Sequence, residues 1–395
     1  MIKSIRLQNF FSFKDETIEL NDNINILLGI NGSGKSNFFK AIRLLREGIT
    51  GQGLRQLIID KWNGFDDVFN SSVLSGEKRI VLEYRFDAKK ISSSQYTFPQ
   101  DPVYQITITP SSGLNYSIQE RLSWKGHPSD WVLVDFRYGR GVLNERKESN
   151  QSLISYSGED PQELALARIN DSDRYPVQKI IKDCISEIVI YDFFDTRAES
   201  KIRRPVANSP LNYLNSDGTN LVHILTLLQR ERQSIYRSVL SELTRVNENF
   251  REISFRQIGT NIELFLVETS LERAVPLAHI SDGTLRYLCL LAIAYNPKRG
   301  RFVCIDEPEL GLHPDMIRGL AECIRTASDE SQFILSTHHE GFLDQFEIEQ
   351  IISIEKDENN SSFATRFNRE NFGELAETRL PGVLWDKGHF GARRW

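Results

Sequence analysis

The chain has 395 residues, 40% of them hydrophobic and 26% charged, which is the composition of a globular protein with a sizeable core. A formal net charge of −6 argues against a strongly basic nucleic-acid binder, although a local basic face is compatible with it. No apolar stretch approaches the roughly 20 residues of a membrane-spanning helix, and the first residues lack the core of a secretory signal. We expect a cytoplasmic protein without a membrane partner, with reduced and buried cysteines at Cys184, Cys289, Cys304 and Cys323.

The first half of the chain predicts an open α/β arrangement with an inserted antiparallel region. Hydrophobic patterning predicts a strand followed by a turn within 2–13, a strand at 24–29, a helix at 37–49, and antiparallel strands at 79–86, 104–110 and 114–124. Residues 140–160 are polar and rich in Gly, Ser, Asn and Glu, which predicts a mobile loop. Helical spacing follows at 161–188 and 219–250.

The second half alternates strands and helices. The patterns predict a strand at 188–194, a hairpin at 254–268 turning at Gly259, a helix at 283–295, a strand at 301–309, a helix at 316–328 and a strand at 332–339. Such alternation near both ends of a chain is typical of a central parallel sheet.

A glycine-rich loop connects the predicted strand at 24–29 to the predicted helix at 37–49. Residues 29–36 read GINGSGKS and fit the pattern G-x-x-x-x-G-K-[ST]. Glycines let backbone N–H groups turn onto phosphate oxygens, and a helix N-terminus favours the same anion. We expect Lys35 to reach the β- and γ-phosphates of ATP and Ser36 to coordinate Mg²⁺. The predicted nucleotide contacts of this loop are Asn31, Gly32, Ser33, Gly34, Lys35, Ser36 and Asn37.

A second chemical motif lies far along the chain. Four apolar residues at 302–305 precede Asp306 and Glu307, which is the Walker B arrangement of a buried strand ending in acids. Asp306 is predicted to hold Mg²⁺, mostly through water, and Glu307 to act as the general base toward the attacking water. Most of the chain separates these acids from Lys35, so we expect two distant segments to close the ATP site.

Ser281 and Gly283 stand at the start of the apolar helix predicted at 283–295. Taken alone, the sequence Ser-Asp-Gly there indicates an ordinary helix cap. Its position shortly before Asp306 resembles the signature motif of the ABC-type ATPases of the SMC, RecF and RecN group. The resemblance implies that Ser281 and Gly283 bind the γ-phosphate of ATP held by a second copy of the chain.

The resemblance extends over nearly the whole chain, strongly at both ends and weakly over residues 50–160. The segment 306–315, DEPELGLHPD, is similar to the Walker B and D-loop stretch, and 334–342, ILSTHHEGF, is similar to the switch strand. His338 then takes the γ-phosphate-sensing position, His313 a structural turn, and His339 no assigned role. More narrowly, IRLQNFFSFKD, YDFFD, SDGTNLVHIL, ISDGTLRYL and LPGVLWDKGHFGARRW resemble the RecF-like AAA-family predicted ATPases of bacteria.

The sequence departs from that family's pattern in several places. The signature reads Ile-Ser-Asp-Gly-Thr, and the Q-loop glutamine is not assigned, with Gln119 and Gln151 as candidates. The chain has no room for the long coiled coil of SMC proteins. The segment after His338 is too short for a TOPRIM nuclease, so no nuclease domain is expected in this chain.

Three further groups of residues are candidates for contacts. The resemblance places Arg6, Asn9 and Ser12 near the adenine or phosphates, with exposed polar positions at a sheet edge as the alternative. Arg203 and Arg204 form a small basic cluster that we interpret as a solvated loop, with a DNA or partner contact as the alternative. A basic and aromatic tail, which docks onto its own domain or a partner or else binds nucleic acid, contains Trp385, Arg393, Arg394 and Trp395.

The resulting prediction is an α/β, ABC-type P-loop fold with a central mixed sheet, an antiparallel β subdomain and a helical signature lobe. Residues 1–160 and 276–395 are assigned to the ATPase lobe and residues 161–275 to the helical lobe. The expected function is ATP hydrolysis by a head-to-tail homodimer or higher homo-oligomer that acts on DNA or on a separate effector, such as a nuclease or toxin, in DNA repair or anti-phage defence. A slow-turnover scaffold and the nucleotide-binding subunit of an ABC transporter are the alternatives.

Overall fold

The computed structural model describes residues 1–51, 53–73, 78–93, 96–113, 115–147, 150–207 and 211–391. They form two units, each built from segments that are distant in the sequence. Residues 1–22, 28–188 and 352–366 belong to the first unit, and residues 23–27, 189–351 and 367 onward to the second. The predicted tail residues Arg393, Arg394 and Trp395 lie outside the described residues.

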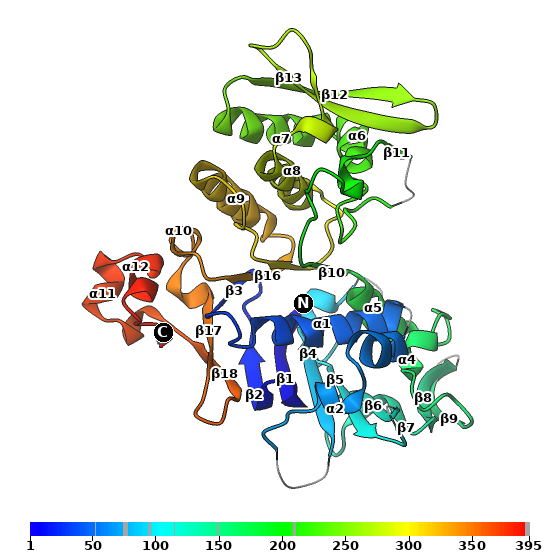
Figure 1. The fold of residues 1–395 in the computed structure, drawn as a ribbon. Helices are drawn as coiled ribbons and strands as arrows, with labels where there is room; N and C mark the ends of the chain where they lie inside the picture. The colour runs from blue at the N-terminus through cyan, green and yellow to red at the C-terminus, as the bar shows by residue number, and fades with distance from the viewer. Residues whose placement is uncertain are drawn as a thin grey trace. The chain divides into compact units, whose positions relative to one another are not determined.

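A mixed sheet forms the first unit (Figure 1). Its order is β17-β18-β2-β1-β4-β5-β6-β7-β8-β9, with β18 parallel to β2 and antiparallel to β17. The strands are β1 (Ile2–Phe10), β2 (Phe13–Glu19), β4 (Ile80–Phe86), β5 (Val103–Pro110), β6 (Tyr116–Trp124), β7 (Trp131–Arg137), β8 (Arg140–Lys147), β9 (Asn150–Tyr156), β17 (Ile351–Lys356) and β18 (Ser362–Arg366). The antiparallel β subdomain expected from the sequence is therefore confirmed.

Residues 140–160 are the main error of the sequence-based prediction. They were expected to be a mobile loop, but β8 and β9 pair in register from Gly141 with Tyr156 to Lys147 with Asn150. One face of this hairpin is buried and the other is exposed, as Leu143 (buried) and Leu153 (57% exposed) show. Only the buried face needs apolar side chains, so most residues of the hairpin can be polar. Composition alone therefore hid an ordered hairpin.

Helices of the first unit pack beside this sheet. They are α1 (Lys35–Thr50), the π-helix η1 (Gln56–Lys61), α2 (Phe65–Val68), α3 (Ala88–Ile91), α4 (Ala165–Arg168) and α5 (Pro176–Ser186). Helix α1 packs against α4 and α5. Its apolar side is buried, with Phe38, Ile42 and Leu45 fully enclosed, and the buried hydroxyl of Tyr84 on β4 donates a 2.6 Å hydrogen bond to the carbonyl of Ala41.

In the second unit the strand order is β10-β15-β16-β3, and β15 and β16 run parallel. These strands are β3 (Ile24–Leu28), β10 (Ile188–Tyr191), β15 (Phe302–Asp306) and β16 (Gln332–Thr337). A separate small sheet contains β11 (Val206–Ala207), β12 (Phe250–Ile258), β13 (Asn261–Glu268) and β14 (Val275–Pro276). The predicted hairpin is confirmed, and Gly259 at its turn has a φ of 59°, which favours glycine.

Helices make up much of the rest of the second unit (Figure 1). They are α6 (Leu221–Glu231), α7 (Gln233–Val246), α8 (Asp282–Tyr295), α9 (Pro314–Ala327), α10 (Glu340–Leu343), α11 (Glu374–Thr378) and α12 (Pro381–Asp386), with 3-10 turns η2 (Lys201–Arg203), η3 (Leu277–His279), η4 (Ile348–Gln350) and η5 (Arg369–Asn371). Helix α8 contacts α6, α7 and α9 and is buried on all sides, as its apolar sequence predicts. Trp385 of α12 is also buried within this unit, so this residue of the predicted tail packs on its own chain.

The four cysteines are free thiols and all are buried, as predicted. Burial raises the pKa of the Cys323 thiol to about 12, so this group stays protonated at neutral pH. The described residues include no helix that is long and apolar enough to cross a membrane.

The contact between Tyr84 and helix α1 yields a stability prediction. Tyr84→Phe should lower the free energy of unfolding by about 1 kcal/mol, because it removes a buried hydrogen bond but keeps the ring. Chemical denaturation followed by circular dichroism measures the change. Tyr138→Phe is the control, because Tyr138 is 52% exposed and should change the stability little. Equal effects of the two substitutions would contradict the role of the buried bond.

Candidate active site

The glycine-rich loop joins β3 to the first turn of α1, as the sequence predicts. Gly32 and Gly34 have φ angles of 82° and 123°, which residues with a side chain rarely adopt. A Cβ atom on Gly34 would also lie 2.4 Å from the Oγ of Ser362. The loop therefore needs glycine at Gly34 for its conformation and for the close approach of β18.

The start of α1 has the chemistry of an anion site. Gly34 caps the helix without a side-chain hydrogen bond from the described residues, and the first turn contains no acid. The Lys35 ammonium donates to the carbonyls of Gly29 at 2.6 Å and Ile30 at 3.2 Å, and Ser36 is exposed in the first turn. Uncapped N–H groups, a lysine and a hydroxyl at one helix end suit a phosphate chain. These residues therefore fit ATP.

Ser12 and Asn37, which lie close to this loop, line a polar pocket of about 480 Å³, called the polar hollow below. Asn37 donates to Ser12 Oγ at 2.9 Å, and Ser362 Oγ donates to Ser12 Oγ at 2.7 Å. The lining also includes Asp66, Asp67, Asn70 and Asn359, and a volume of this size suits a nucleoside. Ser12 was a candidate from the sequence, whereas no sequence motif pointed to Ser362.

Two other candidates of the N-terminal strand have different partners. Arg6 forms a two-pronged ion pair with Asp15 at 2.8 Å, and Asn9 donates to the carbonyl of Arg79 at 2.8 Å. Gln119 lies on β6 and donates to the Tyr138 hydroxyl at 2.7 Å, while the side chain of Gln151 is not described. Their assignment to ATP or to a Q-loop stays a prediction.

The acids Asp306 and Glu307 lie at the end of β15 in the second unit. Glu307 has a φ of 45°, a conformation that costs about 1–3 kcal/mol for a residue other than glycine and is often found at functional sites. Its N–H is held by the carbonyl of Ser336 at 3.2 Å and by the Ser336 hydroxyl at 3.1 Å. The same hydroxyl donates to the carboxylate of Asp306. Strand β16 thus fixes the backbone at which Glu307 turns away from β15.

His338 contacts the predicted general base directly. Its Nδ1 lies 2.8 Å from Oε1 of Glu307, and the side chains are 47% and 25% exposed. A carboxylate accepts hydrogen bonds only, so this contact selects the His338 tautomer with a proton on Nδ1. The structure therefore brings together two of the predicted catalytic residues.

Glu309 is part of this cluster, although no sequence motif predicted a role for it. The side chain is 5% exposed, and Oε1 accepts from the hydroxyl of Thr337. The pKa of Glu309 is raised to about 7, mainly by burial; the charge of the nearby Glu307 acts in the same direction, and the Thr337 hydrogen bond opposes both effects. Arg286 of α8 donates to the carbonyl of Glu307 at 3.2 Å, so α8 also supports this turn.

Ser281 caps α8, as predicted, and its Oγ accepts from the N–H of Thr284 at 3.2 Å. A Cβ atom on Gly283 would lie 2.9 Å from the carbonyl of Gly311, so glycine is needed where α8 approaches the turn after β15. His313 caps α9 through Nδ1, 3.4 Å from the N–H of Asp315, which fits its predicted structural role.

The interpretation of Arg203 as part of a solvated loop is wrong. Arg203 is 7% exposed, and its guanidinium donates to four carbonyls, those of Thr196, Leu277, Ala278 and Ile280, and to the carboxylate of Asp282. These contacts fix the segment that leads into the signature. The neighbouring Arg204 is exposed. Two adjacent arginines in a polar segment look alike in the sequence, so no sequence pattern shows which of them is buried.

Mg²⁺ is implied by the fold class, and the available oxygen ligands are compatible with it. The described residues contain no group of three or more His, Cys, Asp or Glu side chains placed to hold a metal. Protein-bound Mg²⁺ usually needs only one or two protein oxygens beside nucleotide phosphates and water. The Ser36 hydroxyl and the Asp306 carboxylate supply oxygens of this kind, and their assignment to the metal stays a prediction.

A phosphate loop in this strand-to-helix context, together with the geometry of β15 and β16, places the protein among the ABC-type ATPases of the SMC and RecF kind. The same fold occurs in the Smc head domain derived from Pyrococcus furiosus, crystallised bound to the C-terminal domain of ScpA, with a TM-score of 0.58 and 13% identity over 95% of this chain and 98% of that one. Another Smc head, bound to the C-winged helix domain of ScpA, has a TM-score of 0.56 and 15% identity over 94% of this chain and 99% of that one. The α/β fold predicted from the sequence is therefore confirmed.

A family model described as "AAA domain, putative AbiEii toxin, Type IV TA system" matches residues 24–344, and the chain belongs to this family. A Helicobacter pylori protein named "ATP/GTP phosphatase" is 22% identical over 364 residues, which is 87% of each chain. The DNA replication and repair protein RecF of Acetivibrio thermocellus is 33% identical over 92 residues, covering 23% of this chain and 25% of RecF. ATP binding follows from the family, and the predicted resemblance to the RecF and SMC group is confirmed.

The buried carboxyl of Glu309 yields a pH prediction. Its folded pKa of about 7 lies above the ordinary value of 4.5, so its contribution to stability is present below pH 4.5 and lost as the pH rises through 7. Relative to Glu309→Gln, the wild type should lose about 2–3 kcal/mol of unfolding free energy between pH 5 and 8.

Urea denaturation at several pH values measures this difference. Glu358→Gln, at an exposed position, is the control and should follow the wild-type profile. Parallel profiles for the wild type and Glu309→Gln would show that the raised pKa is wrong.

Proposed function

We propose that this protein hydrolyses ATP to ADP and phosphate. The observation that carries the proposal is the fixed position of Glu307, whose backbone is held by Ser336 and whose carboxylate is held by His338, in a chain that also has an uncapped phosphate loop. A carboxylate held in this way is suited to take a proton from water, because its orientation is set before the reaction.

The residues of the phosphate loop bind and orient the triphosphate in this proposal. Lys35 leaves the carbonyls of Gly29 and Ile30 and neutralises the β- and γ-phosphates, while the N–H groups of α1 hold their oxygens. Mg²⁺, held by Ser36 and Asp306, supplies charge neutralisation to the phosphates when bound. The base and ribose occupy the polar hollow beside Ser12 and Asn37.

Glu307 accepts the proton of the attacking water, and His338 keeps the Glu307 carboxylate in place through Nδ1–H. His338 also acts at the γ-phosphate, since almost half of its side chain is exposed beside Glu307. Replacing either residue should therefore affect turnover more than ATP binding.

The signature completes the site of a second copy in a head-to-tail homodimer or higher homo-oligomer. Ser281 and Asp282 are exposed at the N-terminus of α8, a helix of 14 residues, so a phosphate can approach this helix end from outside. The Ser281 hydroxyl, which donates to the Thr284 hydroxyl at 2.8 Å, exchanges that partner for the phosphate on binding. Arg203 and Gly283 hold this segment in shape from within the unit.

Two substitutions separate binding from turnover. Glu307→Gln should reduce the ATPase rate about 100-fold or more and retain ATP binding, because it removes the base but keeps the shape. Lys35→Ala should lose both ATP binding and ATP hydrolysis, because it removes the charge that holds the phosphates. Phosphate release and nucleotide titration measure the two effects, and Glu358→Gln serves as the control. Wild-type turnover no faster than that of Glu307→Gln would leave the slow-turnover scaffold as the function.

A mixture of two inactive variants tests the shared site. Lys35→Ala and Ser281→Arg should each be inactive, but a mixed dimer keeps one intact phosphate loop opposite one intact signature. Random mixing should therefore restore about a quarter of the wild-type ATPase rate. An activity equal to the sum of the two separate variants would contradict a site shared between copies.

The output of hydrolysis is directed to DNA or to an effector protein such as a nuclease or toxin, in DNA repair or anti-phage defence. Support comes from the RecF relatives and from the toxin–antitoxin description of the family. The family match argues against the transporter alternative. Measuring the ATPase rate with and without duplex or single-stranded DNA separates a DNA-directed from an effector-directed process.

A further inference from the structure

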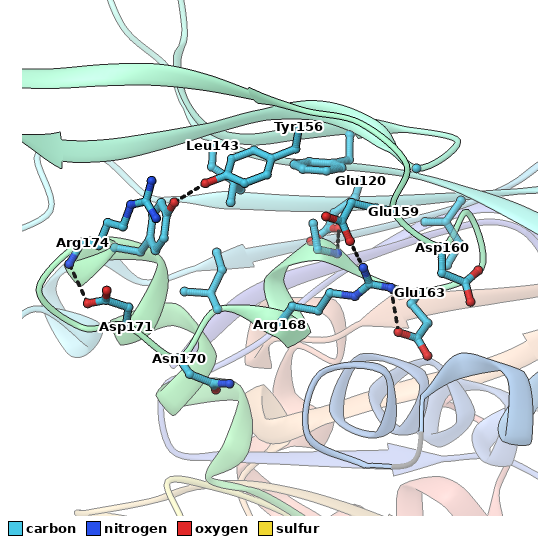
Figure 2. Close-up of a pocket in the computed structure, with 16 residues that line it drawn as sticks. Glu120, Leu143, Tyr156, Glu159, Asp160, Glu163, Arg168, Asn170, Asp171 and Arg174 are labelled. Carbon is cyan, nitrogen blue, oxygen red and sulfur yellow. Dashed lines mark hydrogen bonds and ion pairs between the residues drawn. The ribbon is translucent and has the colours of Figure 1, made fainter.

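A cavity of about 360 Å³ lies in the first unit (Figure 2). Strands β6 to β9 form one side of it, and the segment from Glu159 to Tyr175, which includes α4, forms the other. None of the predicted ATPase residues lines it. Its volume lies at the lower end of the range of about 300–1,000 Å³ for ligand pockets.

The inner part of the cavity is apolar and firmly built. Phe136, Leu143 and Tyr175 are buried there, and Tyr156 of β9 contacts Tyr175 through their hydroxyls at 2.5 Å. Glu120, buried at the back, accepts hydrogen bonds from the Tyr104 hydroxyl and from the N–H groups of Ala165 and Leu166. These walls are aromatic and aliphatic, so they suit a flat apolar group.

The outer part of the cavity is acidic. Glu159 and Glu163 both pair with Arg168, as Figure 2 shows, whereas the carboxylates of Asp160 and Asp171 accept hydrogen bonds from backbone N–H groups. Five carboxylates and two guanidinium groups line the whole cavity. The excess of negative charge favours a cationic occupant and opposes an anionic one.

The adjacent surface has features of a protein contact. Strand β9 is last in the sheet order of the described residues, and an edge strand offers unpaired backbone groups to another chain. Leu153 on this strand is 57% exposed, and Tyr138, next to the cavity residue Gly139, is 52% exposed. An unpaired strand edge with exposed Leu153 and Tyr138 nearby, beside an acidic cavity, is more typical of a docking surface than of an enclosed small-molecule site.

We propose that this cavity receives an aromatic side chain of a partner protein, flanked by arginine or lysine residues in an extended segment that runs along β9. The aromatic ring lies against Phe136, Tyr156 and Tyr175, and the flanking cations face Asp160 and Asp171. The occupied cavity also contacts α4, which follows Leu164. A Cβ atom on Gly48 of α1 would lie 2.9 Å from Leu164, so α4 and α1 are closely packed.

Synthetic peptides test this proposal on the full chain without nucleotide, so its failure leaves the proposed ATP hydrolysis untouched. Isothermal titration calorimetry compares acetyl-Arg-Phe-Arg-amide with acetyl-Glu-Phe-Glu-amide and acetyl-Arg-Ala-Arg-amide. The first peptide should bind, and the other two should bind at least tenfold more weakly, because they lose the charge match or the ring. Phenethylamine is the small-molecule probe and should bind more weakly than the first peptide.

Two variants locate the binding. Asp160→Asn combined with Asp171→Asn keeps the side-chain oxygens that accept from Gln162 and Asp173 but removes both charges, so affinity should fall about threefold to tenfold. Asp357→Asn is the matched control, because Asp357 accepts from the N–H of Asn359 in a similar turn and does not line the cavity.

Leu143→Trp fills the cavity and should abolish binding. Circular dichroism verifies that this variant is folded, and the charge variant decides the outcome if it is not. Equal affinities for the three peptides, binding unchanged in the charge variant, or binding retained by folded Leu143→Trp would overturn the proposal. Phenethylamine binding as tightly as the first peptide would overturn the protein partner and assign a free organic cation instead.

Discussion

The end of β16 determines the chemistry of the second unit. Ser336 and Thr337 at the end of this strand, and His338 directly after it, each hold one acid at or just beyond the end of β15, namely Asp306, Glu309 and Glu307 respectively. The parallel pairing of β15 with β16 puts Asp306 opposite Ser336, so one register aligns all three contacts. A shift by one residue would turn every side chain to the opposite face and would separate these pairs.

This arrangement buries the carboxyl group of Glu309, and the surrounding fold has to offset the cost. One carboxylate oxygen of the buried Glu309 has no hydrogen-bond partner among the described residues. The buried Nε of Arg286 also has no hydrogen-bond partner among them. Such groups cost free energy in an apolar setting. The burial of α8 on all sides and the enclosed strands β15 and β16 provide the rigid apolar support in which the strained backbone of Glu307 persists.

Sequence patterning predicted the elements that carry strong periodicity or motifs. The strands ending at Leu28 and Asp306, the apolar helix α8 and the hairpin at Gly259 all follow from patterns of a few residues. The hairpin of β8 and β9 was missed because its polar composition is shared by ordered edge strands and by loops. The buried role of Arg203 was missed for a different reason: its partners are mostly backbone carbonyls, and a carbonyl acceptor is present at every residue regardless of sequence.

The phosphate loop and the cavity near β9 also differ in how far the sequence predicts them. Phosphate binding requires particular backbone angles, so it selects glycine at Gly32 and Gly34 and leaves a readable motif. The cavity near β9 is formed by residues from strands β6 to β9 and from the segment around α4, and it needs only apolar and acidic side chains at places that tertiary pairing brings together. No local pattern marks such a surface, because many sequences satisfy it. A function that depends on backbone geometry can therefore be predicted from the chain alone, whereas a surface that depends on the pairing of distant strands becomes visible only in the folded structure.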